Sequence, residues 1–500
     1  MRENRTAPSP DITLPEALDN SAMSAVEAEA RTCLILLFCE RSRSVGAVAH
    51  LPEGKPGPLR MLGRGASRSE DPYERLTFGL QRPGSFDAVP PFESESLSRV
   101  QLLVRDDGEG GVQVERRGRL EVRLNGEFVE RHAVAGQGDV LQLGKQMLLL
   151  VSRRPLHLAG PSSDYPCGGF GAPDLLGIVG ESPPIWRLRE RIAHVAKRPG
   201  HVLVLGESGT GKELAARAVH KLSSRGKKLL VARNAATIPD GLAAAELFGN
   251  AKNFPNPGIE RVGLVGEAHG SALYLDEVGE LPEALQAQLL RVLDDGEYHR
   301  LGDSAARTAD VRLIAATNRP RGRLKHDLAA RFMHQIEVPG LNQRIEDIPF
   351  LVRELLQRMT SKDAPRATPD AAHCTPELSL SLLSSLVRHR YSLHTRELQC
   401  FLEQSLTVSK GRHLRRSPEM SFRFDPHCTL EGTVSPSSIS DAGSDPEPEP
   451  KYLQRVQAVL DANNGSVANS WQELGLSSRH VLDRLIRKHR LIIRKTAAPS

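Results

Sequence analysis

The sequence predicts a multidomain chain in which an all-β sandwich is followed by an α/β domain with a helical lid and by a small all-α domain. Three observations lead to this prediction. A length of 500 residues corresponds to about three domains. Short alternating apolar runs fill residues 31–154, whereas in residues 176–339 apolar runs alternate with amphipathic segments, as in a parallel sheet covered by helices. Residues 340–412 and the last fifty residues have helical periodicity.

Changes in composition divide the chain further. Residues 1–30 are polar, contain proline and have no periodicity, which indicates disorder. Two stretches rich in proline and other linker residues, 155–175 and 413–450, are predicted to be linkers, the second of them flexible. The domains that remain are the β-sandwich (31–154), the α/β core (176–339), the helical lid (340–412) and the terminal helical domain (451–497).

Composition and cysteine usage exclude several classes of protein. The hydrophobic share of 39% and the charged share of 25% are typical of a soluble globular protein. The longest apolar runs, such as residues 34–38, are far shorter than the roughly 20 residues of a membrane-spanning helix, so we expect no membrane contact. The six cysteines form no CxxC pair, which argues against a zinc site or a disulfide framework. No signal peptide is recognisable, and we expect a cytoplasmic protein.

A phosphate-binding loop is predicted where the strand-like residues 201–205 are followed by GESGTGKE and an amphipathic helix. In such a turn the backbone N–H groups face the phosphates, the helix dipole favours their charge, and the lysine reaches the β- and γ-phosphates. The predicted ATP-binding residues are Gly206, Glu207, Ser208, Gly209, Thr210, Gly211, Lys212 and Glu213. Taken alone, the string is also compatible with a glycine-rich turn whose lysine is solvated.

Polar side chains end two other predicted strands. Asp276 and Glu277 follow residues 272–275, at the place where a P-loop enzyme holds magnesium and the attacking water. We therefore predict that Asp276 binds Mg²⁺ and that Glu277 polarises the water. Asn318 follows the strand-like residues 311–316 and is predicted to sense the γ-phosphate. The expected cofactors are ATP and Mg²⁺.

These motifs occur in order as parts of the strings GESGTGKE (206–213), ELFG (246–249), LYLDEVGELP (273–282), LLRVLDDGEYHRLG (289–302) and RLIAATN (312–318). Together they make residues 176–412 resemble the AAA+ ATPase domain of sigma-54-dependent transcriptional activators. The resemblance implies ATP hydrolysis coupled to transcription regulation in bacteria. In that family the P-loop also ends in glutamate, as it does here at Glu213.

The resemblance implies further site residues. Asn234 matches the asparagine that restrains the catalytic glutamate, and Arg396 matches the lid arginine that reports the nucleotide state. Arg331 matches the arginine finger that reaches into a neighbouring subunit's site, and Lys325 stands where a second arginine is usual. A site completed by a neighbour implies a homo-oligomer, usually a hexameric ring.

Two segments depart from the family pattern. Residues 391–394 read YSLH where the family has Trp-Pro-Gly-Asn, which predicts a different lid hinge. The GAFTGA loop that grips sigma-54 is replaced by NFPNPG, in which Phe254 supplies the aromatic side chain and the two prolines fix φ. Phe254 is therefore the expected sigma-54 contact. The loop's alternative is a rigid turn with no partner.

The last fifty residues carry nine basic and three acidic side chains, a net charge of +6 that is typical of binding to a phosphate backbone. Two apolar helical stretches flank Gly475 and resemble the Fis-type helix-turn-helix domain of the same activators. The DNA-binding residues that this resemblance implies are Ser477, Ser478, Arg479, His480, Arg484, Arg487 and Lys488. A basic, solvated helical hairpin is the alternative.

At the other end, short motifs around residues 62–64, 97–101, 124–126 and 138–144 resemble a forkhead-associated domain, a β-sandwich that binds phosphothreonine. Arg64 and Ser98 match its phosphate contacts. The alternative is a structural or protein-docking module.

The overall prediction is a regulator that binds DNA, possesses an ATPase ring and acts on the sigma-54 RNA polymerase holoenzyme. One rival is a DNA-binding repressor or architectural protein that uses ATP only for assembly. A second is a phosphorylation-controlled AAA+ protein that acts on another target.

Overall fold

The computed structural model describes residues 30–39, 42–161, 165–254, 259–318, 326–360, 377–409, 413–417 and 420–424. All of them belong to the first of the chain's two units, residues 1–432. The predicted helix-turn-helix, with its DNA-binding residues from Ser477 to Lys488, lies outside the described residues, and so does Lys325.

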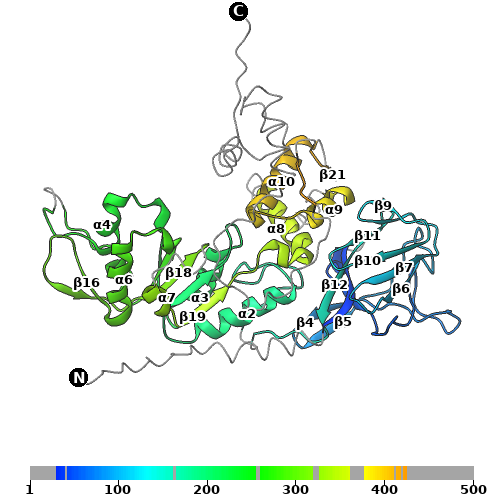
Figure 1. The fold of residues 1–500 in the computed structure, drawn as a ribbon, viewed down its shortest axis with the longest axis horizontal. Helices are drawn as coiled ribbons and strands as arrows, with labels where there is room; N and C mark the ends of the chain where they lie inside the picture. Colours follow the sequence, from blue (N-terminus) through cyan, green and yellow to red (C-terminus); the bar gives the residue numbers. More distant parts are fainter. Residues whose placement is uncertain are drawn as a thin grey trace, which may run out of the picture. The chain divides into compact units, whose positions relative to one another are not determined.

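The N-terminal region is β-rich, as predicted, and forms two antiparallel sheets (Figure 1). The first has the strand order β5-β4-β2-β1-β12-β11-β8-β9, and the second has the order β10-β7-β6-β3. The strands are β1 (Ala30–Cys39), β2 (Val48–His50), β3 (Arg60–Leu62), β4 (Gly79–Arg82), β5 (Ser85–Ala88), β6 (Leu102–Asp106), β7 (Val112–Arg116), β8 (Val122–Leu124), β9 (Glu127–Phe128), β10 (His132–Ala135), β11 (Val140–Leu143) and β12 (Met147–Pro155).

Strand β1 is buried on both of its faces. Successive side chains of a strand point to opposite faces of the sheet. On one face Leu34 and Leu36 join the core between the two sheets. On the other face Cys33, Ile35 and Leu37 join a second core cluster, which contains the apolar side chains of the lid helices. The continuous apolar run of β1 therefore serves two cores.

The α/β core has a five-stranded sheet with the order β14-β15-β18-β13-β19, and every pair of neighbours is parallel, as predicted. Its strands are β13 (Val202–Leu205), β14 (Leu230–Asn234), β15 (Ala272–Asp276), β18 (Arg312–Thr317) and β19 (His334–Glu337). The helices are α2 (Pro183–Ala196), α3 (Lys212–Leu222), α4 (Ala243–Phe248), α5 (Leu264–Glu267), α6 (Glu283–Asp295) and α7 (His326–Ala330). A short hairpin pairs β16 (Glu297–His299) with β17 (Ala306–Thr308).

Alternation along the central strands divides this core in two. Val202 and Val204 face the cluster that contains residues of α2 and α3, while Leu203 faces the cluster that contains residues of α4, α5 and α6. Because helices cover both faces, the strands are apolar throughout.

The lid consists of α8 (Ile348–Thr360), α9 (Leu380–Arg388) and α10 (His394–Val408), with a two-residue pairing of β20 (Glu377–Leu378) and β21 (His413–Leu414). Phe350 of α8 is buried against Phe170, and a Cβ at Gly46 or Gly171 would lie 2.4 Å from its ring. Leu414 and Met420 are also buried in the lid core. None of the helices in these described segments is long and apolar enough to span a membrane.

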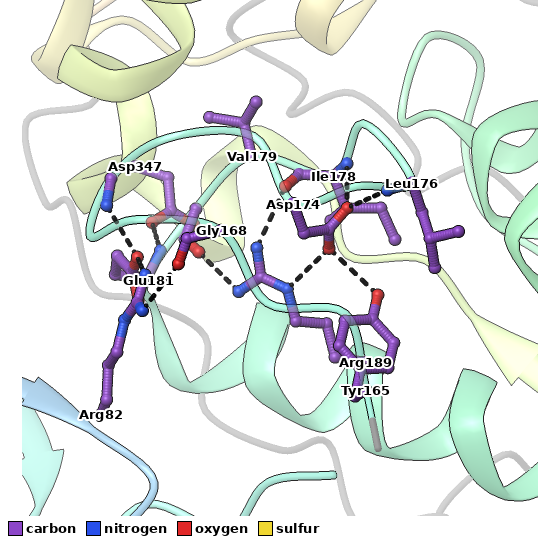
Figure 2. A network of polar contacts seen from close by, with 12 residues as sticks. Arg82, Tyr165, Gly168, Asp174, Leu176, Ile178, Val179, Glu181, Arg189 and Asp347 are labelled. Carbon is purple, nitrogen blue, oxygen red and sulfur yellow. Dashed lines mark hydrogen bonds and ion pairs between the residues drawn. The ribbon is translucent and has the colours of Figure 1, made fainter. Parts of the chain in front are cut away.

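A polar network joins the β-rich region, residues 165–181 and the lid (Figure 2). The Arg82 guanidinium donates to the Glu181 carboxylate at 3.1 Å, and the Asp347 carboxylate accepts from the Glu181 N–H at 2.7 Å. Arg189 forms an ion pair with the buried Asp174 at 3.0 Å. Each buried charge in this network therefore has a partner, as buried charges require.

Candidate functional site

The predicted phosphate-binding loop follows β13 and leads directly into α3. Gly209 and Gly211 have φ values of +82° and +104°, which residues with a side chain rarely adopt. A Cβ at Gly209 would lie 2.2 Å from the Leu393 carbonyl oxygen, so this glycine is also required by the close approach of the lid. The loop thus has the backbone geometry that exposes N–H groups to an anion.

Lys212 places its charge inside this loop. Its side chain is only 7% exposed, and its ammonium donates to the carbonyl oxygens of Gly206 and Glu207 at 3.0 and 3.2 Å. The same ammonium lies 3.6 Å from a carboxylate oxygen of Glu277. The loop and the acidic pair are therefore in direct contact, although they are far apart in the sequence.

Asp276 and Glu277 stand at the carboxyl end of β15. Burial raises the pKa of Asp276 above its ordinary value, Glu277 raises it further, and Lys212 opposes both effects. A divalent cation would stabilise the ionised form of such a carboxylate. In the part of the chain that the structure describes, no cluster of three or more His, Cys, Asp or Glu side chains could hold a metal ion by itself. A protein magnesium site usually combines one or two carboxylates with phosphates and water, and Asp276 is a carboxylate of this kind.

Glu277 has a backbone conformation that is rare for a residue with a side chain, with φ at +52°. The carboxylate of the same residue accepts a hydrogen bond from the backbone N–H of Asn318 at 3.2 Å. Because β15, β18 and β13 are neighbours in the sheet, their carboxyl ends bring Glu277, Asn318 and the P-loop to one edge. This juxtaposition is the one that the strand-end motifs predicted.

Asn234 lies at the end of β14, opposite Asp276 in the register. Its side-chain oxygen accepts from the Ala236 N–H at 2.9 Å and so caps the following turn. The contacts of the Glu277 carboxylate are with Lys212 and Asn318. The restraint of Glu277 by Asn234 therefore stays a prediction.

Arg331 follows α7 on the surface. Its side chain is 55% exposed and pairs with Asp294 of α6 at 3.0 Å. The ion pair is exposed, so it holds Arg331 weakly. A role in a neighbouring subunit's site stays a prediction.

The start of α10 contacts the P-loop. The Thr395 N–H donates to the Gly209 carbonyl at 3.2 Å, and the Arg396 guanidinium donates to the Ser208 hydroxyl at 3.1 Å. His394 is buried and lies 3.1 Å from the Glu207 carboxylate. The sequence motifs assigned a role to Arg396 but none to His394, whose only signal was the unusual YSLH string.

Phe254 lies beyond α4, in the segment predicted to contact sigma-54. Its side chain is 42% exposed, and one side of its ring rests on Gly302, where an added Cβ would lie 2.3 Å from the ring. The next four residues, 255–258, lie outside the described residues. The aromatic side chain is thus partly available at the surface.

Arg64 and Ser98 are neighbours in the β-rich region, because the Arg64 N–H donates to the Ser98 carbonyl at 2.9 Å. The Ser98 hydroxyl accepts from the Arg119 N–H at 3.1 Å. Beside them Arg99 pairs with Asp71 at 2.8 Å. The two residues predicted to contact a phosphate are therefore brought together, next to further arginines.

Comparison with known proteins identifies the α/β core. The sequence model of the sigma-54 interaction domain matches residues 178–338. The chain is 36% identical over 322 residues to the formate hydrogenlyase transcriptional activator of Salmonella typhimurium, a match that covers 62% of this chain and 44% of that protein. It is 34% identical over 319 residues to the transcriptional regulatory protein ZraR of Escherichia coli, covering 62% of this chain and 68% of ZraR. It thus spans less than half of the length of the first relative.

Among solved structures, NtrX from Brucella abortus in complex with ATP is 27% identical. The alignment covers 62% of this chain and 68% of that one, with a TM-score of 0.42.

Proposed function

This chain belongs to the sigma-54-dependent transcriptional regulators, and we propose that it hydrolyses ATP in a ring of subunits to remodel a sigma-54 RNA polymerase complex. The observation that carries the proposal is the contact of Lys212 with both the P-loop and Glu277. It joins a phosphate-binding charge to a carboxylate suited to activating water.

The residues of this edge have distinct roles in the proposed reaction. Lys212 and the loop N–H groups bind the phosphates, and Glu277 orients and polarises the attacking water. Asp276 holds Mg²⁺, which when bound neutralises charge on the β- and γ-phosphates. Arg396 approaches the phosphates from the lid, since it already contacts Ser208.

The proposal includes a ring because each nucleotide site would receive a positive charge from a neighbouring subunit. Arg331 would supply this charge to the neighbour's γ-phosphate, as an arginine finger does. Its exposure of 55% supports a role outside its own subunit. A hexamer is the usual assembly of such rings.

The other proposed partners are DNA and a phosphothreonine protein. The net charge of +6 in the last fifty residues supports DNA binding through Ser477, Ser478, Arg479, His480, Arg484, Arg487 and Lys488. The adjacency of Arg64 and Ser98 supports recognition of a phosphate by the β-rich region.

The sequence of the loop after Asn253 favours a second candidate function. NFPNPG replaces the sigma-54 contact, so the protein would be a DNA-binding repressor or architectural regulator that uses ATP only for assembly. In this case hydrolysis would be dispensable for regulation in cells.

A gel-shift assay separates the two functions. The full chain, with sigma-54 bound to a pre-melted promoter fragment, should give an ATP-dependent shifted species. Phe254→Ala should hydrolyse ATP at the wild-type rate and lose the shift, because the side chain lies outside the nucleotide site. Hydrolysis by the wild type without any shift would refute sigma-54 remodelling and favour the second function.

A further inference from the structure

The first turn of α10 is bound to the P-loop at three consecutive positions. Besides the bonds from Thr395 to Gly209 and from Arg396 to Ser208, His394 contacts the Glu207 carboxylate. The lid and the phosphate-binding loop therefore meet residue by residue. Of the three contacts, only that of His394 is a side-chain pair between an imidazole and a carboxylate.

The hydrogen bonds of the His394 ring fix its proton. Its Nδ1 accepts from the backbone N–H of Leu341 at 3.2 Å, so the ring proton is on Nε2. Nε2 lies 3.1 Å from Glu207 and donates to it. One imidazole ring thus ties the chain at Leu341, which follows β19, to the P-loop.

The backbone at His394 is held in an unusual conformation. Its φ is +48°, and the residue is 1% exposed. Non-glycine residues in this region persist where the surrounding structure imposes the conformation, often at functional sites. Two contacts surround it here: the Glu397 carboxylate accepts the N–H groups of the preceding Ser392 and Leu393, and the ring packs on Gly340, where a Cβ would lie 2.6 Å from it.

Stability of the fold does not account for this arrangement. The Glu207 side chain is 73% exposed and would be solvated without the histidine. A bond whose carboxylate partner is solvated in this way contributes little to folding. The bond between His394 and Glu207 instead keeps α10, which carries Arg396, close to the P-loop.

We propose that His394 is a positioning residue that holds α10 on the P-loop, so that Arg396 stays within reach of the bound nucleotide. The proposal rests on the nucleotide site of the proposed function. The bond lies between the loop that touches the phosphates and the helix that reports on them. Breaking it lets the lid move away from the site.

His394→Asn is the decisive variant. Asparagine tolerates a positive φ, and its Oδ1 can take the place of Nδ1 as acceptor for the Leu341 N–H, but it is too short to reach Glu207. Binding of a fluorescent ADP analogue to the full chain should weaken about three- to tenfold, as expected for one lost hydrogen bond. The KM for ATP should rise similarly and kcat should change less than about twofold, because Asp276 and Glu277 lie at the carboxyl end of β15 and not on the lid.

Glu207→Ala removes the same bond from the exposed side, where folding is not at risk. In a wild-type background it should weaken ADP binding, and in the His394→Asn background it should have a much smaller effect, since a shared interaction makes the losses non-additive. Gln399→Ala is the matched control, because this α10 side chain bonds Glu403 of the same helix and should leave ADP binding unchanged.

The outcomes are distinguishable. Additive losses, or His394→Asn binding ADP as tightly as the wild type, overturn the positioning role alone. A wild-type chain that binds no ADP overturns the nucleotide site and the proposed function with it. Non-additive losses with an unchanged melting temperature support the proposal.

Discussion

Replacing Glu346 with glutamine should make the protein increasingly more stable than the wild type as the pH rises from 5 to 8. Glu346 is 8% exposed and lies just before α8. Among the described residues its only ion-pair partner is Arg154, whose Nη1 lies 3.8 Å from the Glu346 Oε2. Its Oε2 accepts no hydrogen bond there. Burial raises the pKa of Glu346 from 4.5 to about 7, with Arg154 opposing the shift and Asp347 adding to it.

The sign follows from proton binding. Above pH 4.5 the unfolded chain releases the Glu346 proton, whereas the folded chain keeps it until about pH 7. The free energy of unfolding therefore falls through this window, by on the order of 3 kcal/mol for a pKa of 4.5 in the unfolded chain and about 7 in the folded one. Glutamine does not ionise, so the variant does not lose this free energy.

The assay is thermal melting of both full-length proteins at pH 5, 6, 7 and 8. The difference in melting temperature should grow by several degrees and level off above pH 7. His50, whose pKa burial lowers to about 4, destabilises both proteins as the pH falls below 6.5, so its effect cancels in the difference. Glu403→Gln, at an exposed carboxylate of α10, is the matched surface control. A difference for Glu346→Gln that stays the same from pH 5 to pH 8 would refute the reasoning.

Four further changes test other contacts. Arg189→Met leaves Asp174 buried without its cation and should destabilise the protein by about 3–5 kcal/mol in thermal melting; a loss below about 1 kcal/mol would contradict this. Phe350→Ala, at a side chain 3% exposed, should lose about 3–5 kcal/mol, and an unchanged melting temperature would mean that the lid does not depend on this packing. Glu277→Gln should lower ATP turnover by about 100-fold or more while ADP still binds. Mixing Arg331→Ala with Glu277→Gln should restore part of the turnover if the site is shared between subunits, and no recovery would argue against a finger acting in trans.

Local sequence was sufficient to predict much of the fold and the juxtaposition of the candidate site residues. A glycine-rich turn between an apolar strand and an amphipathic helix has few alternative structures, and parallel strands necessarily end at one edge of their sheet. This is why Lys212, Glu277 and Asn318 could be expected together from three separate motifs.

Contacts across long distances in the sequence could not be predicted in the same way. His394 and Glu207 are 187 positions apart, and the bond between them depends on a positive φ that no propensity favours at a histidine. The apolar run of β1 indicated burial, but its partner on the second face lies in the lid. The helical periodicity of the lid does not indicate which strand its apolar side chains will pack against.

Because β1 is buried on both faces, removing it exposes part of the lid. A fragment of residues 176–412 would lack Cys33, Ile35 and Leu37 and would expose the lid side chains that pack against them. Exposed apolar patches of this kind promote association. A fragment of this kind would associate through this bare face, so the proposed assembly has to be tested with the β-rich region attached.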